Sequence, residues 1–250
     1  MVIIGLDVGS RSIELVMMEG EEITLQQRED TTYNPLAQCN KMLDGLSWDH
    51  LVVTGYGRKL LAQHFPAREI TEIQAYALGT RRLFPGGRAI LDIGGQDTKA
   101  ISLSPAGGVR KFEMNDRCAA GTGKFLEFMA VSLSRPLDDF GTFALRGAPG
   151  IAINSMCTVF AETEATSLMA RGCRPEDIAL ALHMTVVSRS VSMLRRVGSE
   201  GPVIFAGGVA RNPCLVKLIR DALEGEVLIP KEPDLVGALG AALYGFQNPV

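Results

Sequence analysis

The feature that most constrains the fold is a short strand–turn–strand unit that occurs twice in the sequence. Each copy has an apolar, β-prone run, a turn that begins with aspartate and contains glycine, and a second extended run. Leu6-Asp7-Val8-Gly9 in the first copy aligns with Leu91-Asp92-Ile93-Gly94 in the second. We therefore interpret the chain as an internal duplication of a β-hairpin module. Strand, turn and strand cover residues 2–6, 7–12 and 13–18 in the first copy and 89–91, 92–97 and 98–103 in the second.

A third glycine turn, Gly207-Gly208, follows the apolar run 203–206 and precedes a helix expected from about 213 to 223, with proline at its first position. The segment Pro85-Gly86-Gly87-Arg88 is the best linker in the chain. We therefore predict one subdomain from residues 1–87 plus 234–250 and a second from 88–233. Further helices are predicted over 34–46, 58–63, 72–83, 175–197 and 233–246, the last rich in small residues that permit close packing.

The glycine turns point to a nucleotide. A glycine turn after a strand brings backbone N–H groups against phosphate oxygens without obstruction by a side chain. One such turn means little, because tight hairpins need glycine anyway, but two related turns can hold phosphates from both sides. Asp7 and Asp92 would then hold Mg²⁺, mostly through waters; the alternative for either aspartate alone is a residue that caps its own turn. Gly207-Gly208 offers a flat surface suited to adenosine, and the sequence has neither a P-loop nor a Rossmann fingerprint.

Two cysteines stand just ahead of predicted helices. Cys118 lies in a polar, glycine-bearing turn before a helix whose N-cap is Thr122 or Gly121, and Cys157 opens a helical run that reaches about Arg171. A thiolate at a helix start faces free N–H groups and the positive end of the helix dipole. This arrangement favours anionic ligands such as the sulfides of an iron–sulfur cluster. The alternative is that each cysteine is a small buried hydrophobe.

The other cysteines fit different roles. Cys39 and Cys214 fall in apolar stretches and are expected in the core, and Cys173 is expected in a loop. Five cysteines without a Cys-x-x-Cys pair argue against a simple disulfide framework and against local zinc-finger spacing. If Cys118 and Cys157 bind a cluster, one chain supplies two ligands where four are usual, and a two-fold dimer would complete the set.

Composition excludes several classes of protein. The 250 residues are 46% hydrophobic and 21% charged, as in an ordinary globular protein. The formal net charge of −3 shows no basic excess, so we expect no nucleic-acid partner. The first residues lack the basic segment of a signal peptide, and no uninterrupted apolar run approaches the ~20 residues of a membrane span. We expect a cytoplasmic protein without a membrane partner.

The motifs resemble those of the acetate and sugar kinase/Hsp70/actin superfamily. Residues 7–10 and 92–97 resemble its two phosphate motifs, and residues 206–209 resemble its adenosine motif. Within it, the sequence is similar to the ATP-dependent activators of 2-hydroxyacyl-CoA dehydratases, which are related to the ATPase subunits of benzoyl-CoA reductase. The segments that carry this closer resemblance are Gly55-Tyr56-Gly57-Arg58, 114–126 around Cys118, 155–162 around Cys157, and 237–244.

The resemblance implies an α/β, actin-like (ribonuclease H-like) duplicated fold with two subdomains around a nucleotide cleft. It implies a homodimer that holds one [4Fe–4S] cluster through Cys118 and Cys157 of each subunit. ATP hydrolysis would drive a low-potential electron, received from a ferredoxin or flavodoxin, to a partner iron–sulfur metalloenzyme in an anaerobic setting. We expect Asp7 and Asp92 to organise Mg²⁺ and the attacking water, with Gln96 positioning that water. The expected nucleotide-binding residues are Gly9, Ser10, Arg11, Gly94, Gly95, Gly207 and Gly208.

Two parts of the chain depart from the family pattern. Glu14 stands where members usually carry a lysine, and Ala75-Tyr76 stands where activators commonly have Cys-His. These changes indicate a less usual branch and leave the partner open between a hydroxyacyl-CoA dehydratase and another reductase with unusual clusters. Two other functions stay open as well. One is a small-molecule kinase of the same fold, and the other is a non-catalytic nucleotide-gated dimer whose cysteines bind zinc or form a disulfide.

Overall fold

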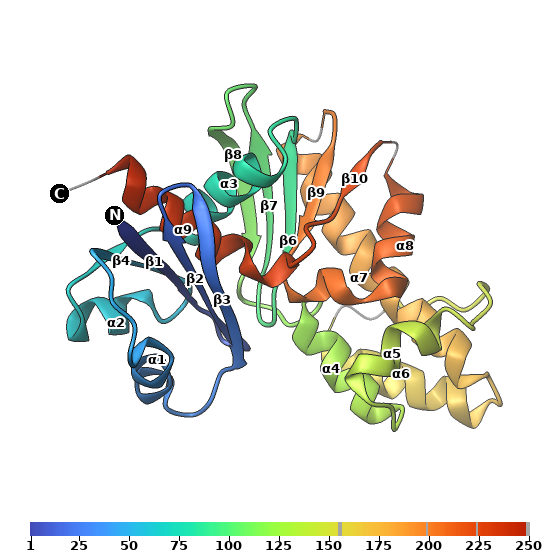
Figure 1. Cartoon of the computed structure of the whole chain (residues 1–250). Helices are drawn as coiled ribbons and strands as arrows, with labels where there is room; N and C mark the ends of the chain where they lie inside the picture. The colour runs from blue at the N-terminus through green and yellow to red at the C-terminus, as the bar shows by residue number, and fades with distance from the viewer. Residues whose placement is uncertain (155–156, 199, 224, 249–250) are drawn as a thin grey trace.

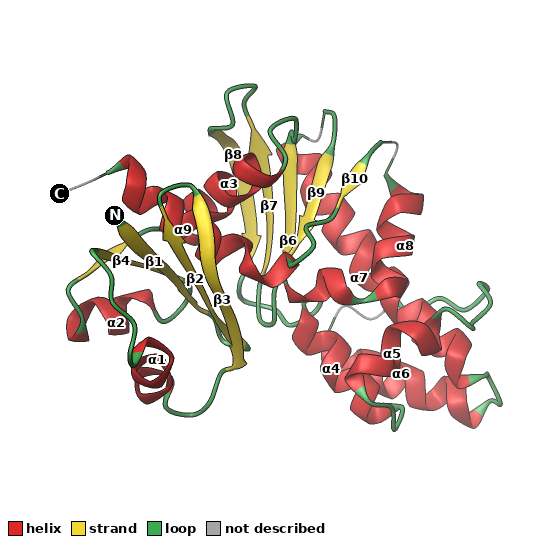
Figure 2. Ribbon diagram, viewed as in Figure 1, coloured by secondary structure: helices red, strands yellow, loops and turns green. Residues whose placement is uncertain are grey.

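The computed structural model describes residues 1–154, 157–198, 200–223 and 225–248. It contains two five-stranded mixed sheets that stand beside one another, with helices packed around them (Figures 1 and 2). The first sheet has the order β3-β2-β1-β4-β5 and the second has the order β10-β9-β6-β7-β8. The strands of the first sheet are β1 (Val2–Val8), β2 (Ser12–Glu19), β3 (Glu22–Asp30), β4 (His50–Thr54) and β5 (Ala67–Glu69). Those of the second are β6 (Ala89–Ile93), β7 (Thr98–Leu103), β8 (Val109–Asn115), β9 (Val203–Ala206) and β10 (Val227–Leu228).

The two sheets share one topology, which confirms the predicted duplication. In each, three antiparallel strands form a meander, and two further strands then join in parallel beside the first strand. The first strand of each meander runs through its aspartate, so Asp7 and Asp92 lie inside β1 and β6 rather than in the turns where the sequence placed them. The parallel pairing of β1 with β4 and of β6 with β9 extends these strands to the aspartates.

Each predicted hairpin proves to be a three-stranded meander, because β3 and β8 follow. The sequence did not indicate these third strands. Most residues of β3 and β8 are exposed or half-buried and many are polar, so no apolar alternation marks them. A strand of this kind is held by backbone pairing to its neighbour and not by burial of its own side chains.

The helices largely agree with the prediction. Those predicted over 72–83 and 175–197 have the same bounds in the structure, and the last helix begins three residues late because a 3-10 turn, η2 (Pro233–Leu235), precedes it. The helices are α1 (Pro35–Leu43), α2 (Arg58–His64), α3 (Glu72–Leu83), α4 (Gly123–Ser132), α5 (Leu137–Ala144), α6 (Thr158–Ala170), α7 (Pro175–Val197), α8 (Pro213–Ala222) and α9 (Val236–Gln247).

Helices α3 and α9 pack together beside the first sheet, on the side that faces the second (Figure 1). A Cβ at Gly240 of α9 would overlap the carbonyl oxygen of Ala75 in α3. A Cβ at Gly5 of β1 would overlap the backbone of α9 at Ala238. The expected close packing of this small-residue helix is therefore confirmed, and it joins the last helix of the chain to its first strand.

The cysteines outside the proposed ligand pair lie where the sequence placed them. Cys39 and Cys214 are fully buried, and Cys173 lies in a loop. Among the described residues, α7 is the one helix long and apolar enough to cross a membrane, but 67% of its most apolar stretch is buried inside the protein. That burial is typical of a core helix.

Candidate nucleotide site and cysteine loops

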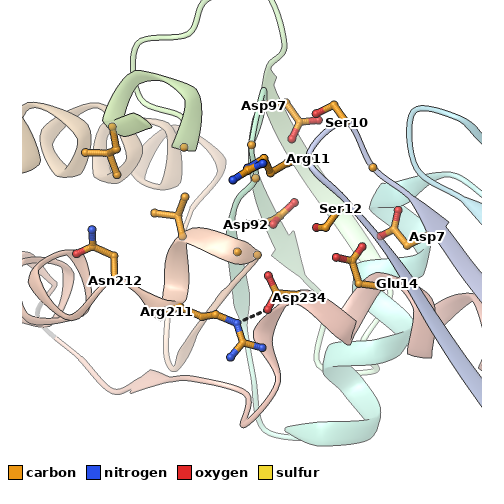
Figure 3. A pocket seen from close by; sticks show the side chains of 18 of the residues that line it. Asp7, Ser10, Arg11, Ser12, Glu14, Asp92, Asp97, Arg211, Asn212 and Asp234 are labelled. Carbon is orange, nitrogen blue, oxygen red and sulfur yellow. Dashed lines mark hydrogen bonds and ion pairs between the residues drawn. The ribbon is translucent and has the colours of Figure 1, made fainter. Parts of the chain in front are cut away.

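A cavity of about 460 Å³ lies between the two sheets, at the carboxyl ends of β1, β6 and β9 (Figure 3). Its volume falls in the range of small-ligand sites, roughly 300–1,000 Å³. Both aspartate-glycine turns and the 207–213 segment line it, so three segments far apart in sequence meet there. The predicted site residues that line it are Asp7, Gly9, Ser10, Arg11, Asp92, Gly94, Gly95, Gly207 and Gly208. Gln96 is exposed and is not among the lining residues, so its role in positioning water stays a prediction.

The two turns have the same internal geometry. The amide of Gly9 donates to the carbonyl of Ser12 at 3.0 Å, and the amide of Gly94 donates to the carbonyl of Asp97 at 2.9 Å. The turns also approach one another across the cavity, because a Cβ at Gly95 would lie 2.7 Å from the Cβ of Arg11. A ligand held in this cavity can therefore contact both turns at once.

Asp7 and Asp92 form a buried acidic pair. Asp7 is 7% exposed and Asp92 is 1% exposed. Burial raises the pKa of Asp92 to about 6, against a lowering by Lys99. Burial, and then the charge of Glu14, raise the pKa of Asp7 well above its usual value.

The donor set fits a hydrated divalent cation. Within the part of the chain that the structure describes, Asp92 Oδ1 and Glu14 Oε1 are buried without a hydrogen-bond partner, and both side chains line the cavity. A bound cation would satisfy Asp92 Oδ1. No three such side chains converge as a complete metal site among the described residues, so Mg²⁺ would be held largely through waters and phosphate oxygens.

Lys99 is a site residue that the sequence reasoning missed. Its ammonium lies 3.1 Å from Asp92, 2.8 Å from Asp97 and 2.8 Å from Glu72 at the start of α3. Burial lowers the pKa of Lys99, but the three carboxylates outweigh it and hold that pKa well above the usual value. Alignment of the two modules could have found this residue, because Lys99 lies opposite Asp92 as Glu14 lies opposite Asp7.

The opposite wall of the cavity is the glycine turn after β9 and the helix α8 that follows. Gly207 has a φ of +83°, and a Cβ there would overlap Asp92 Oδ1, so the turn requires glycine for two reasons. Asn212 caps α8 by accepting from the amides of Cys214 and Leu215 at 3.0 and 3.1 Å. Arg211 is held by Asp234, as Figure 3 shows. Apolar lining here comes from Leu126, Leu137, Val209 and Pro213, which suits an adenine ring.

The Cys118 loop is bonded directly to the second phosphate turn. The amides of Gly123 and Lys124, the first residues of α4, donate to the carbonyls of Gly94 and Gly95 at 2.9 and 2.7 Å. The buried hydroxyl of Thr98 donates to the carbonyl of Gly121 at 2.7 Å. Three hydrogen bonds therefore join the second phosphate turn and the start of β7 to the Cys118 loop and α4.

These bonds correct one expectation. The first two amides of α4 do not face Cys118, because the carbonyls of Gly94 and Gly95 occupy them. The helix starts five residues after the cysteine, at Gly123, with Thr122 as its N-cap. By contrast, Cys157 is itself the N-cap of α6. Stabilisation of a thiolate by the start of a helix is therefore expected at Cys157 and not at Cys118.

Both predicted ligand cysteines are accessible thiols. Cys118 is half-buried and Cys157 is exposed, and neither is in a disulfide. The segment just before Cys157, Ser155-Met156, lies outside the described residues. Accessible thiols are a requirement for ligands of a cluster that two chains share.

The duplicated fold with a nucleotide-sized cavity between its halves defines an actin-like ATPase. The sequence matches the BadF/BadG/BcrA/BcrD ATPase family over residues 4–245, and the chain belongs to that family. It is 38% identical to the activator of lactoyl-CoA dehydratase from Anaerotignum propionicum, over 98% of this chain and 97% of that protein. These findings confirm the predicted α/β fold class and the ATPase assignment.

Two solved structures are also similar. The activator of the 2-hydroxyisocaproyl-CoA dehydratase from Clostridium difficile, solved with bound ADPNP, superposes with a TM-score of 0.90 at 36% identity, covering 99% of this chain and 95% of that one. Component A of the (R)-2-hydroxyglutaryl-CoA dehydratase from Acidaminococcus fermentans superposes with a TM-score of 0.92 at 32% identity, covering 99% and 98%. The fold is therefore that of dehydratase activators over nearly its whole length.

Proposed function

We propose that this chain is an ATP-hydrolysing, iron–sulfur electron-transfer activator that delivers a low-potential electron to a partner metalloenzyme. The observation that carries the proposal is the set of hydrogen bonds from α4 and Thr98 that join the Cys118 loop to the second phosphate turn. This connection gives nucleotide chemistry a route to a redox site. The named relatives are dehydratase activators, which favours this function over a small-molecule kinase.

At the nucleotide, the two glycine turns and Ser10 and Arg11 would bind the phosphates, and Gly207-Gly208 would bind the adenosine. Asp7 and Asp92 would orient the waters around Mg²⁺ and the water that attacks the terminal phosphate. The bound Mg²⁺ would supply charge neutralisation of the phosphates. Closing the cavity around the phosphates would move Gly94 and Gly95, and α4 would follow.

At the cysteines, we propose that Cys118 and Cys157 of two subunits hold one [4Fe–4S] cluster, which would serve as a one-electron carrier. The exposed apolar side chains of α4 and α6 support a homodimer at this end of the molecule, because such residues are usually covered. They are Phe128, Val131, Val159 and Phe160.

The finer assignments belong to the same proposal. The partner is a 2-hydroxyacyl-CoA dehydratase or another unusual-cluster reductase, and a ferredoxin or flavodoxin supplies the electron in an anaerobic cytoplasm. The division into residues 1–87 plus 234–250 and 88–233 is our proposal for the two bodies that move.

The test is anaerobic purification followed by an absorption spectrum, iron analysis and an ATPase assay without any acceptor. We expect a brown protein, a dimer with about two iron atoms per chain, and ATP turnover. A colourless zinc protein, or ATP turnover only when a small hydroxyl substrate is added, would contradict the proposal.

A further inference from the structure

The duplicated modules carry opposite charges at one equivalent position. The strand register places Glu14 opposite Asp7 in the first module and Lys99 opposite Asp92 in the second. The second module therefore has a cation beside its aspartate, and the first has an acidic side chain instead. Glu14 is 4% exposed and lines the cavity, and its Oε1 has no hydrogen-bond partner in the described chain. An acidic side chain at that place offers a polyphosphate no positive charge.

The third strand of the first module carries a cation at the matching position. β3 pairs Arg28 with Glu14, whereas β8 pairs Met114 with Lys99. Residues directly opposite on neighbouring strands project from the same face of a sheet. Arg28 accordingly lines the cavity together with Glu14, and its Nε lies 3.8 Å from Glu14 Oε1 and 3.8 Å from Asp234 Oδ1.

The side chains that line the cavity are mostly acidic, so a cation among them that could bind phosphate is significant. Two of the cations in its lining are held by short ion pairs. Lys99 has three carboxylates within 3.1 Å, and Arg211 has Glu232 at 2.6 Å and Asp234. The described lining residues include eight carboxylates (Asp7, Glu14, Glu72, Asp92, Asp97, Glu127, Asp138 and Asp234) and four cations (Arg11, Arg28, Lys99 and Arg211).

The contacts of Arg28 leave the Nε donor of its guanidinium available to a ligand. Its Nη2 bonds to the exposed Asp30 at 3.1 Å, but its Nε is too far from Glu14 and Asp234 for a hydrogen bond to either. The buried side chains of Glu14 and Asp234 flank the guanidinium at the cavity wall but accept no hydrogen bond from its Nε. A phosphate oxygen could accept from those donors without breaking a short ion pair.

We infer that Arg28 is a phosphate-binding residue of the nucleotide site, and that the cation absent from β2 is supplied from β3. Glu14 and Asp234 are the positioning residues that hold its guanidinium toward the cavity. The planar guanidinium, with its fixed fork of donors, is suited to phosphate oxygens. The inference rests on the proposed function, because it requires that the cavity binds ATP.

The experiment measures binding of MgATP and of adenosine by calorimetry to the full-length protein and its variants. Arg28→Gln should weaken MgATP binding about 10-fold or more, the effect of losing one charged hydrogen bond, and should leave adenosine binding unchanged. Arg28→Lys should bind MgATP with an affinity between those of the wild type and Arg28→Gln, because a lysine keeps the charge but lacks the forked donors of the guanidinium. Arg110→Gln, on the exposed strand β8, is the matched control and should bind both ligands as the wild type does.

The double variant Glu14→Lys/Arg28→Gln moves the cation back to β2 and should recover most of the MgATP affinity lost in Arg28→Gln. Equal MgATP binding by wild type and Arg28→Gln would overturn the inference while leaving the proposed function intact. So would a loss that extends to adenosine and is not recovered in the double variant, because that pattern indicates damage to the fold. A wild-type protein that binds no MgATP would overturn the proposed function itself.

Discussion

The amide of Lys124 donates a 2.7 Å hydrogen bond to the carbonyl of Gly95, so the first turn of α4 rests on the second phosphate turn. Gly123 makes the same contact with Gly94 at 2.9 Å. Because helices are stiff and these bonds are short, we expect a displacement of the turn to displace the helix with it. The Cys118 loop lies between β8 and this helix, and it has to accommodate the movement.

The coupling can be tested through the hydroxyl of Thr98, which holds the loop carbonyl of Gly121. Thr98→Val keeps the shape of the side chain but removes the donor, at a cost of about 1–3 kcal/mol for the buried carbonyl left without a partner. In cluster-free protein, the alkylation rate of Cys118 should differ between MgADP and a non-hydrolysable ATP analogue. We expect Thr98→Val to reduce that difference.

Mass spectrometry of the alkylated peptides gives the rate at each cysteine. Thr24→Val, which removes an exposed hydroxyl on β3, is the matched control and should behave as wild type. If Cys118 reacts at one rate in both nucleotide states of the wild type, the loop does not respond to the nucleotide.

The aspartates of the duplicated module should be essential for hydrolysis. Asp7→Asn and Asp92→Asn remove a buried charge at nearly constant shape, and we expect ATP hydrolysis to fall by about 10²-fold or more because the water shell of Mg²⁺ loses its anchors. Iron content and absorption spectrum should stay at wild-type levels, since the cysteines lie elsewhere. Asp44→Asn, on the surface after α1, should retain full activity.

The cysteine assignment predicts a pattern across the chain. Cys118→Ser and Cys157→Ser should each abolish the cluster spectrum, because a four-cysteine site shared by two chains loses two ligands at once. Cys173→Ser, in a loop, should keep about two iron atoms per chain. Iron near four atoms per chain in a monomeric wild type would show that each chain holds its own cluster.

Glu14 should make the stability of the nucleotide-free protein fall as pH rises. Burial raises the pKa of Glu14 to about 8, against a usual value of 4.5. Between these two values the unfolded chain loses its proton while the folded one retains it, so stability present at low pH is lost as pH rises from about 4.5 to about 8. Glu14→Gln removes this loss, and its melting temperature should exceed that of the wild type at pH 8 but not at pH 4.5.

Thermal melts without nucleotide or Mg²⁺ at several pH values measure this effect. Asp44→Asn serves again as the control, because its side chain is exposed and is not among the residues that line the cavity. A wild type and a Glu14→Gln variant whose melting temperatures run parallel over the whole range would contradict a buried, protonated Glu14.

The contact between α3 and α9 predicts a large stability effect from one methyl group. Gly240→Ala places a Cβ on the carbonyl of Ala75, and relieving that overlap has to separate the two helices. We expect a loss of about 3 kcal/mol or more in the free energy of unfolding, which denaturant titration measures. Gly86→Ala is the control, because a Cβ there meets nothing within 4 Å, and it should unfold like the wild type.

Much of the fold could be predicted from local signals. The capping threonine Thr71 and the proline Pro175 mark the starts of α3 and α7, and both helices begin where these residues indicate. The duplicated turns predicted most of the residues that line the cavity, because aspartate and glycine in a turn after a strand are a pattern that can be recognised locally. Strand β3 escaped notice, since its polar residues carry no periodic signal.

The rest of the site depends on pairing between strands. Nothing near Arg28 in the sequence indicates a phosphate, and only the register between β2 and β3 brings it beside Glu14. Alignment of the two modules could have indicated Lys99, but its three carboxylates come together from β6, the turn and α3 only in the fold. The hydrogen bonds from Gly123 and Lys124 to the phosphate turn join segments that are remote along the chain. No local sequence pattern could therefore predict them.

The chain passes between the two sheets twice, once from α3 into β6 and once from β10 back into α9 (Figure 1). Two crossings restrain relative motion more than one does. One connecting segment would allow the two halves to rotate in any direction. Two connecting segments restrict them mainly to rotation about the line that joins the two connections. We therefore expect the cavity to open by rotation about α3 and α9, which would carry α4 along with the second sheet.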